Sequence, residues 1–405
     1  MKAKGSKVFD VTIIGAGVIG AAIARELSKY DLKVAIVEAN IQVAEETSAG
    51  NSGVIHGGFD PTPGTLHAKF NISGRKIYEK EWFKELDFPR AKVDSLVLAF
   101  DDSEEEEIRN LFEQGLTNGL TPNELRILNR EQCLQLEPNL NPEVVAALLC
   151  TCSHIVDPVA LTNSLVENAV LNGATIFLGS KVQSIDSTPE SFAIEALNYH
   201  LQTDIYHSRF IVNAAGHYAD VIADMIDDRD FTLKARRGQY RILEKTERHT
   251  INNHILFMAP TIHGKGVIVA PMLDGHLLVG PTAEEGIAKE DTRLVTIEKF
   301  AEIGIIGKKI APSLRIEKTC GVMSGSRSIC VETDDFVIRP ASKDRRFIHV
   351  AGISSPGLSA APAIARQVIS FIKAQTKLVA KTNFIRKQPI AVPNRGEALR
   401  SVFQA

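Results

Sequence analysis

The pattern of hydrophobic and polar positions at the beginning of the chain changes from strand-like to helical and back to strand-like. Residues 8–14 form an apolar run rich in β-branched side chains, and a glycine-rich turn follows over residues 15–20. Residues 21–29 place small and apolar side chains on one side of a helical period, and residues 32–38 are a second apolar run. This order predicts a strand, a turn, a helix and a second strand, which together make one βαβ unit.

Later segments continue the alternation of helix and strand patterns. Helical periodicity predicts helices over residues 66–86 and 158–172, and Asp157 stands where the second helix needs an N-cap. The same analysis predicts strands over 175–178, 181–185 and 210–216, a β-hairpin over 266–272 and 277–280, a strand over 347–352 and a helix from about residue 358. Alternating strands and helices of this kind indicate an α/β fold.

Composition and charge exclude several classes of protein. The chain has 405 residues, 44% of them hydrophobic and 23% charged, which is typical of a globular protein and predicts two domains. The net charge of −3 argues against nucleic-acid binding and against strong attraction to a membrane surface. No apolar run is long enough to cross a membrane, and the basic N-terminus lacks the cleavage site of a secretory signal. We therefore expect a cytoplasmic protein, with leaderless surface exposure left open.

Cysteine usage agrees with a reducing compartment. Five cysteines at sparse spacing do not suggest a disulfide framework. Cys150 and Cys152 are too close together for the usual zinc or redox pattern, so we expect structural thiols and no metal site.

The glycine turn matches the G-x-G-x-x-G pattern of dinucleotide-binding proteins. Gly15 is expected to form the tight turn, Gly17 to let the backbone approach a pyrophosphate, and Gly20 to allow close packing of the helix. The helix N-terminus would offer free N–H groups and a positive dipole end to the anion. Glu38, at the end of the second strand, would accept hydrogen bonds from an adenosine ribose. Because NAD and FAD share the same ADP half, the motif by itself leaves both cofactors open.

A polar, glycine-bearing loop over residues 47–53 follows, and the sequence VIHGG comes directly after it. With this loop the sequence resembles the D-amino-acid-oxidase-like superfamily of FAD oxidoreductases. Over about residues 8–375 it resembles, more narrowly, the type 2 glycerol 3-phosphate oxidases of mycoplasmas. The motifs that carry this resemblance are residues 47–48 (TS), 51–56 (NSGVIH), 237–240 (RGQY), 260–266 (PTIHGKG), 280–283 (GPTA), 325–327 (GSR) and 355–358 (SPGL).

The resemblance implies a reaction, a cofactor and a set of site residues. The reaction would convert sn-glycerol 3-phosphate and O2 to dihydroxyacetone phosphate and H2O2, a product that could matter to a host cell, and the cofactor would be FAD. His56 would be the catalytic proton acceptor, and the substrate would be bound by Ser52, His56, Lys265, Arg327 and Ser355. Together with the glycine motif, the resemblance names as FAD contacts Gly15, Gly17, Ile19, Gly20, Glu38, Thr47, Ser48, Ser52, Gly53, Val54, Val182, Gly216, Gly352, Ile353, Ser354 and Ser359.

The residue types suit this chemistry. Oxidation of a secondary alcohol needs a base near the hydroxyl, and a neutral histidine such as His56 serves near pH 7. A phosphomonoester dianion favours two cations, for which Arg327 offers a bidentate fork and Lys265 a mobile point charge. A 2-hydroxy acid or an amino acid would need only the arginine.

The predicted architecture is therefore a Rossmann-like FAD-binding domain of the D-amino-acid-oxidase type with a second, mixed-sheet substrate domain. The FAD domain is expected over residues 1–75, 150–218 and 325–375, the substrate domain over 76–149 and 219–324, and a C-terminal extension over 376–405. Three alternatives stay open. They are an L-2-hydroxyglutarate or amino-acid oxidase of the same fold, a glycerol 3-phosphate dehydrogenase that passes electrons to a quinone, and a flavin-binding protein without turnover. The oligomeric state is not predicted.

Overall fold

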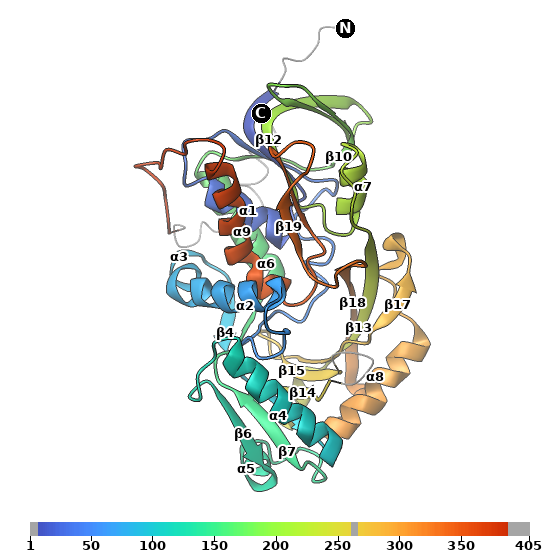
Figure 1. Ribbon diagram of the computed structural model, residues 1–405. Coiled ribbons are helices and arrows are strands. Elements are labelled where there is room, and N and C mark those ends of the chain that lie inside the picture. The colour runs from blue at the N-terminus through green and yellow to red at the C-terminus, as the bar shows by residue number, and fades with distance from the viewer. Residues whose placement is uncertain (1–6, 261–265, 388–405) are drawn as a thin grey trace.

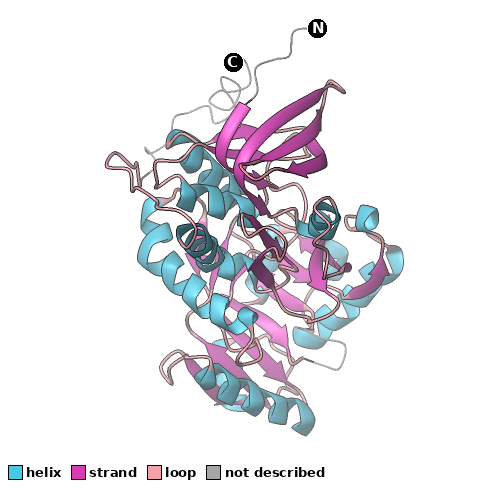
Figure 2. Ribbon diagram, turned by 45° about the horizontal axis from the view of Figure 1, so that its top comes forward, coloured by secondary structure: helices cyan, strands magenta, loops and turns pink. Residues whose placement is uncertain are grey.

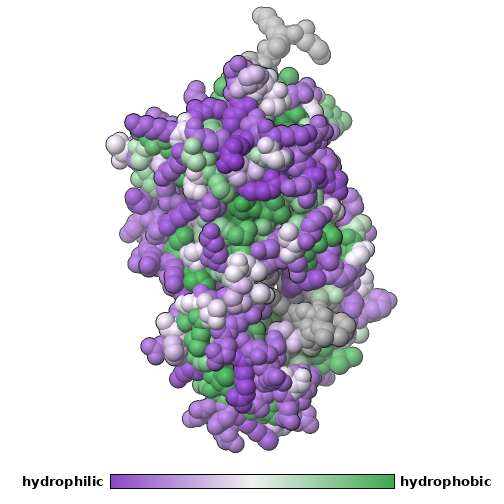
Figure 3. Space-filling model, viewed as in Figure 1, coloured by the Kyte–Doolittle hydropathy of each residue, from purple (hydrophilic) through white to green (hydrophobic). Residues whose placement is uncertain are grey.

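The computed structural model describes residues 7–260 and 266–387. Figure 1 shows two main sheets in the upper and lower halves of the molecule, and Figure 2 shows helices packed along them. Within the described ranges, no helix combines the length and apolar character that crossing a membrane requires. Hydrophilic residues cover most of the face seen in Figure 3, and apolar residues are visible toward its middle.

The first sheet contains the predicted βαβ unit. It has eight strands, and the path β10-β11-β12-β1-β2-β9 is extended by β20 beside β12 and by β19 beside β20. Strand β1 lies parallel to both β12 and β2, and β12 lies parallel to β20. Its strands are β1 (Lys7–Ile14), β2 (Val34–Val37), β9 (Thr175–Phe177), β10 (Ser180–Ser187), β11 (Phe192–Asn198), β12 (Thr203–Asn213), β19 (Val337–Pro340) and β20 (Phe347–Ala351).

Helices from distant parts of the chain pack on this sheet. Helix α1 contacts both α6 and α9, and α2 packs on α9. One apolar core joins these helices to the parallel strands, because each helix presents small and aliphatic side chains to the sheet. The helices are α1 (Val18–Leu27), α2 (Leu66–Ile77), α6 (Pro158–Leu171) and α9 (Gly357–Lys373).

The second sheet has nine strands in the order β17-β13-β16-β15-β14-β5-β7-β6, with β18 pairing along β13. The strands are β5 (Asp94–Ala99), β6 (Leu125–Asn129), β7 (Ala146–Cys150), β13 (Leu233–Leu243), β14 (His254–Met258), β15 (Ile268–Pro271), β16 (Leu277–Gly280), β17 (Glu284–Ile287) and β18 (Thr319–Cys330). Helices of this half are α4 (Asp102–Thr117), α5 (Arg130–Leu136) and α8 (Ile297–Ile310). Helix α8 contacts β13, β15 and β16, and helix α4 contacts β5, β6 and β7.

Three short strands form a small third sheet in the order β3-β8-β4. Its strands are β3 (Val54–Ile55), β4 (Arg90–Lys92) and β8 (His154–Val156). The remaining elements are α3 (Phe83–Glu85), α7 (Ala219–Asp224), the π-helical residues Tyr78–Trp82 and the 3-10 turns Gly216–Tyr218, Lys245–Thr250, Lys289–Asp291 and Ile316–Lys318.

Several predicted elements are present with adjusted bounds. The predicted helix over 66–86 consists of α2, the π-helical turn and α3. The Asp157 side chain caps α6 by accepting hydrogen bonds from the N–H groups of Val159 and Ala160. The predicted hairpin is the antiparallel pair β15 and β16. All five cysteines are free thiols, as expected.

The division into domains stays a prediction. The predicted boundary at residue 325 falls inside β18, which pairs with β13 through to Cys330. The predicted C-terminal extension is partly described. Ala380 forms a bridge with Tyr30 and Lys381 donates to the Lys29 carbonyl, so this segment lies against the turn after α1. Residues 388–405 lie outside the described residues.

Candidate active site

The glycine turn between β1 and α1 is as tight as its sequence predicts. Gly15 has φ +107°, and a Cβ there would lie 2.4 Å from the Ala214 carbonyl oxygen at the end of β12. A Cβ at Gly20 would lie 2.0 Å from the Gly15 carbonyl oxygen. Side chains at these two positions would collide with the backbone, so glycine is required to hold the start of α1 against the carboxyl ends of β1 and β12.

Glu38 comes directly after β2, beside this turn, and is buried. Its carboxylate accepts hydrogen bonds from the N–H groups of Ala16 at 2.6 Å and Asn40 at 2.8 Å. Burial raises the pKa of Glu38, and the two backbone donors oppose that rise. Each oxygen keeps a further lone pair, so the side chain can hold the turn and accept from a ribose hydroxyl at once.

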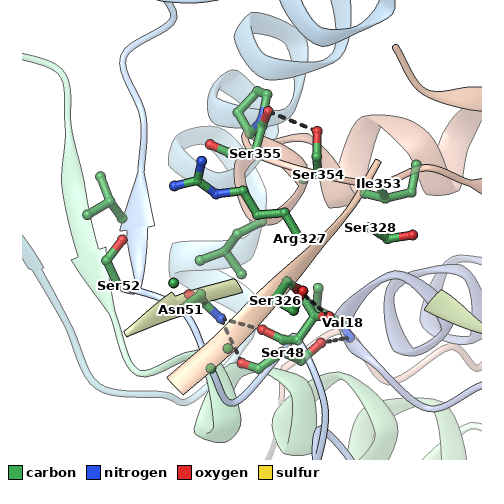
Figure 4. Close-up of a pocket in the computed structure, with 18 of the residues that line it drawn as sticks. Val18, Ser48, Asn51, Ser52, Ser326, Arg327, Ser328, Ile353, Ser354 and Ser355 are labelled. Carbon is green, nitrogen blue, oxygen red and sulfur yellow. Dashed lines mark hydrogen bonds between the residues drawn. The ribbon is translucent and has the colours of Figure 1, made fainter. Parts of the chain in front are cut away.

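The loop after β2 folds over the start of α1 (Figure 4). The Ser48 hydroxyl accepts from the Val18 N–H at 2.9 Å, and the Thr47 hydroxyl donates to the Ser326 carbonyl at 2.8 Å. Asn51, which the sequence analysis did not assign, ties the loop together. Its amide donates to the Ser48 carbonyl at 2.8 Å and accepts from the Gly53 N–H at 2.8 Å.

These segments surround one large cavity. It holds about 1300 Å³ of empty space, open solvent at its mouth included. Twelve of the predicted site residues line it: Gly17, Ile19, Thr47, Ser48, Ser52, Val54, His56, Gly216, Arg327, Ile353, Ser354 and Ser355. The cavity thus runs from the N-terminus of α1 to the loop between β20 and α9.

Other predicted residues lie behind the cavity wall or beyond the described chain. Gly15, Gly20, Glu38, Gly53, Val182, Gly352 and Ser359 do not line the cavity. Val182 follows Ser180, whose N–H donates to the Glu38 carbonyl at 2.7 Å, so β10 begins beside the predicted ribose site. The predicted Lys265 lies outside the described residues.

His56 stands at the exit of β3 and is partly buried. Its ring centroid is 5.9 Å from that of Phe257 on β14, which also lines the cavity. Its backbone N–H donates to the Ser359 hydroxyl at 2.8 Å. Ser359 is fully buried near the start of α9, and its hydroxyl accepts this bond from the backbone of His56. The position of Ser359 near the flavin ring stays a prediction.

Arg327 enters the cavity from β18. In the view of Figure 4 its side chain extends away from the strand toward Ser355. The guanidinium is partly buried and has no hydrogen bond or ion pair to any residue in the ranges 7–260 and 266–387. An uncompensated guanidinium at a cavity wall is suited to an anionic ligand.

Sequence reasoning missed several residues of this cavity and its wall. Tyr240 lines the cavity from β13, and Ser326 lines it from β18. The Ser326 hydroxyl is buried and has no hydrogen-bond partner among the described atoms. His217, directly after Gly216, places Nε2 3.2 Å from the Ser326 carbonyl oxygen, and burial lowers its pKa to about 4. A histidine directly after a strand that ends in glycine was the available signal for His217.

Comparison with known proteins decides the family. Residues 10–370 match the family described as FAD dependent oxidoreductase. The chain belongs to this family. Its cofactor is FAD. It is 43% identical to the glycerol 3-phosphate oxidase of Mycoplasma genitalium over 371 residues, which are 92% of this chain and 96% of that protein. It is 40% identical to the glycerol 3-phosphate dehydrogenase of Caloramator mitchellensis, over 95% of this chain and 78% of that protein.

Two solved structures share the fold of this chain. The dithionite-reduced L-alpha-glycerophosphate oxidase from Mycoplasma pneumoniae with FAD bound superposes with a TM-score of 0.91 at 42% identity, covering 95% of this chain and 100% of that one. Glycine oxidase from Geobacillus kaustophilus has a TM-score of 0.80 at 18% identity, which shows a common fold alone.

The structure of the described residues, considered apart from the relatives, also fits FAD. The N–H of Ile19 has no intrahelical acceptor, because it lies in the first turn of α1, and Ile19 lines the cavity. The orphaned Ser326 hydroxyl supplies a further hydrogen-bonding group in the same wall. Residues of the turn, of the 47–53 loop and of the loop before α9 would therefore hold the cofactor.

Proposed function

We propose that this flavoenzyme oxidises sn-glycerol 3-phosphate with O2 to dihydroxyacetone phosphate and H2O2. The observation that carries the proposal is the uncompensated Arg327 guanidinium in the same cavity as His56. The identity of 43% with the Mycoplasma genitalium oxidase, over nearly the whole of both chains, supports it.

Bound FAD supplies the acceptor for the hydride that leaves the substrate carbon. The chain's own residues bind and orient the alcohol and remove its proton. His56 would accept the hydroxyl proton, held in place by its backbone bond to Ser359. Arg327 would bind two phosphate oxygens with its planar fork, while Ser52 and Ser355 would orient the substrate from opposite loops. A role for Lys265 in phosphate binding remains a prediction from the sequence.

The experiment is an anaerobic titration of the purified yellow protein with sn-glycerol 3-phosphate, followed by admission of air and assay of H2O2. Bleaching of the flavin and rapid return of colour with peroxide are the expected result. A flavin that does not bleach would refute the substrate, and L-2-hydroxyglutarate and amino acids would be titrated next. Bleaching with slow reoxidation would refute the oxidase step.

Slow reoxidation by air, which would indicate a dehydrogenase, is tested because one relative carries that name. The Caloramator mitchellensis protein carries the name dehydrogenase at 40% identity, close to the identity with the oxidases. A quinone or dye added after bleaching distinguishes the two, because a dehydrogenase returns its colour with the dye and not with air.

A further inference from the structure

Strand β13 presents two different faces. Arg237, Gln239 and Arg241 point to one face, where Arg237 and Gln239 bond to Glu284 and Arg241 bonds to the Phe300 carbonyl. Because side chains alternate along a strand, Gly238 and Tyr240 point to the other face, and both line the cavity.

Tyr240 shares this face with Arg327. In the antiparallel pair of β13 and β18, Arg236 lies opposite Arg327, Gly238 opposite Gly325, and Tyr240 opposite Met323. Opposite residues point to the same side of a sheet, so Tyr240 and Arg327 flank one pair of glycines on the cavity side. Neither glycine carries a side chain, and Pro281 and the Gly50 backbone pack against them, because a Cβ at Gly238 would lie 2.7 Å from the Pro281 Cβ and one at Gly325 would lie 1.8 Å from the Gly50 carbonyl oxygen.

The Tyr240 ring is buried, and its hydroxyl makes no hydrogen bond to residues 7–260 or 266–387. The residue is 6% exposed, and its oxygen is not among the fully buried side-chain atoms of these ranges that lack a partner, so the hydroxyl is open to the cavity that Tyr240 lines. The hydroxyls of the other buried tyrosines are paired within the chain: Tyr78 donates to the Leu358 carbonyl and Tyr206 pairs with Ser180.

The phenol remains a hydrogen-bond donor at neutral pH. Burial raises the pKa of Tyr240, and the positive charge of nearby Arg327 opposes this by a smaller amount. The phenol is therefore protonated beside a guanidinium, and the two groups together offer donors and no carboxylate. This combination matches an anion with more than two acceptor oxygens.

We propose that Tyr240 is a substrate-binding residue that donates a hydrogen bond to the phosphate group held by Arg327 and thereby selects phosphomonoesters over carboxylates. The inference rests on the proposed function and extends it. A carboxylate has two oxygens, which the guanidinium fork occupies, whereas a phosphate has a third oxygen for the phenol. A substrate without that oxygen leaves a buried phenol unpaired, and such a site discriminates strongly.

The test uses the FAD-loaded enzyme and the variant Tyr240→Phe, which keeps the ring and removes the hydroxyl. The expected result is a KM for sn-glycerol 3-phosphate raised about 10- to 100-fold with kcat changed by less than about threefold. Tyr206→Phe is the matched control, because Tyr206 is also buried but lies in β12 away from the cavity. It should leave both constants unchanged.

Two further readouts separate binding from a packing role. Glycerol lacks the phosphate, so its kcat/KM should be equal in the wild type and in Tyr240→Phe. Inorganic phosphate, titrated against the flavin spectrum, should bind about 10-fold more weakly to the variant and should raise its melting temperature less. The phosphate titration does not depend on turnover, so it tests Tyr240 even if glycerol 3-phosphate proves not to be the substrate.

An unchanged KM and an unchanged affinity for inorganic phosphate would overturn the inference. Equal losses with glycerol and with glycerol 3-phosphate would overturn it as well, because they would show that the hydroxyl acts on the flavin or on packing rather than on the phosphate.

Discussion

Arg327→Ala should lower kcat/KM for sn-glycerol 3-phosphate by about 100- to 1,000-fold while FAD remains bound. Two hydrogen bonds from a guanidinium to a phosphate are worth about 1.5–3 kcal/mol each. Arg327 is only partly buried, so solvent screening favours the lower end, a total of about 3–4 kcal/mol. Each 1.36 kcal/mol corresponds to about a tenfold change in rate, which gives the expected factor.

The structure provides a matched control on the neighbouring strand. Arg236 lies directly opposite Arg327, but it forms an ion pair with Glu285. Arg236→Ala removes the same charge from the same pair of strands and should change kcat/KM by less than about threefold. Arg327→Lys restores the charge without the fork, and its kcat/KM should lie between those of the wild type and the alanine variant.

The assay is steady-state H2O2 production at saturating O2, with the ratio of flavin to protein absorbance as the measure of bound FAD. No described residue pairs with Arg327, so its removal leaves no group unpaired and the melting temperature should hold. A kcat/KM within about threefold of wild type, with FAD bound, would show that the anion does not bind at this guanidinium.

Three other variants test separate parts of the site. His56→Gln should lower kcat by about 100- to 10,000-fold with the flavin spectrum retained, and near-normal bleaching in a stopped-flow trace would remove His56 as the base. Glu38→Gln should weaken FAD binding about 10-fold, because the carboxylate holds the Ala16 N–H; titration of the apoprotein with FAD measures this, and equal affinity would contradict it. Burial lowers the pKa of His217 from 6.5 to about 4, so between these pH values the unfolded chain binds a proton at His217 and the folded chain does not. The free energy of unfolding should therefore fall by about 3 kcal/mol, through this histidine, as the pH drops from 6.5 to 4. Urea unfolding of His217→Asn at pH 7 and pH 4.5 should show a smaller loss than the wild type; an equal loss would exclude the contribution.

The N-terminal βαβ unit could be predicted from sequence because its causes are local. The apolar runs, the glycine turn and the helix follow one another along the chain, and each depends on backbone geometry that nearby residues impose. Gly15 and Gly20 are examples, since a side chain at either position would strike the backbone of the turn or of the neighbouring strand. The same local logic predicted the Asp157 cap and the β15–β16 hairpin.

Motifs also identified residues that the fold gathers from distant positions. Ser52, His56, Arg327 and Ser355 line one cavity, although they come from three separate stretches of the chain. Resemblance to a family named these residues, whereas periodicity and spacing alone could not have related them to one another.

Tyr240, Ser326 and the bond from His56 to Ser359 depend on contacts that no local pattern encodes. Tyr240 faces the cavity because of the register of β13 against β18, and a shift of one residue would turn it to the opposite face. His56 and Ser359 are 303 positions apart, and they meet because α9 packs against β3, the strand directly before His56. Neighbouring residues along the chain thus determine the backbone turns and helices. Which side chains share a cavity is decided by strand register and helix packing, because these bring together surfaces that are far apart along the chain.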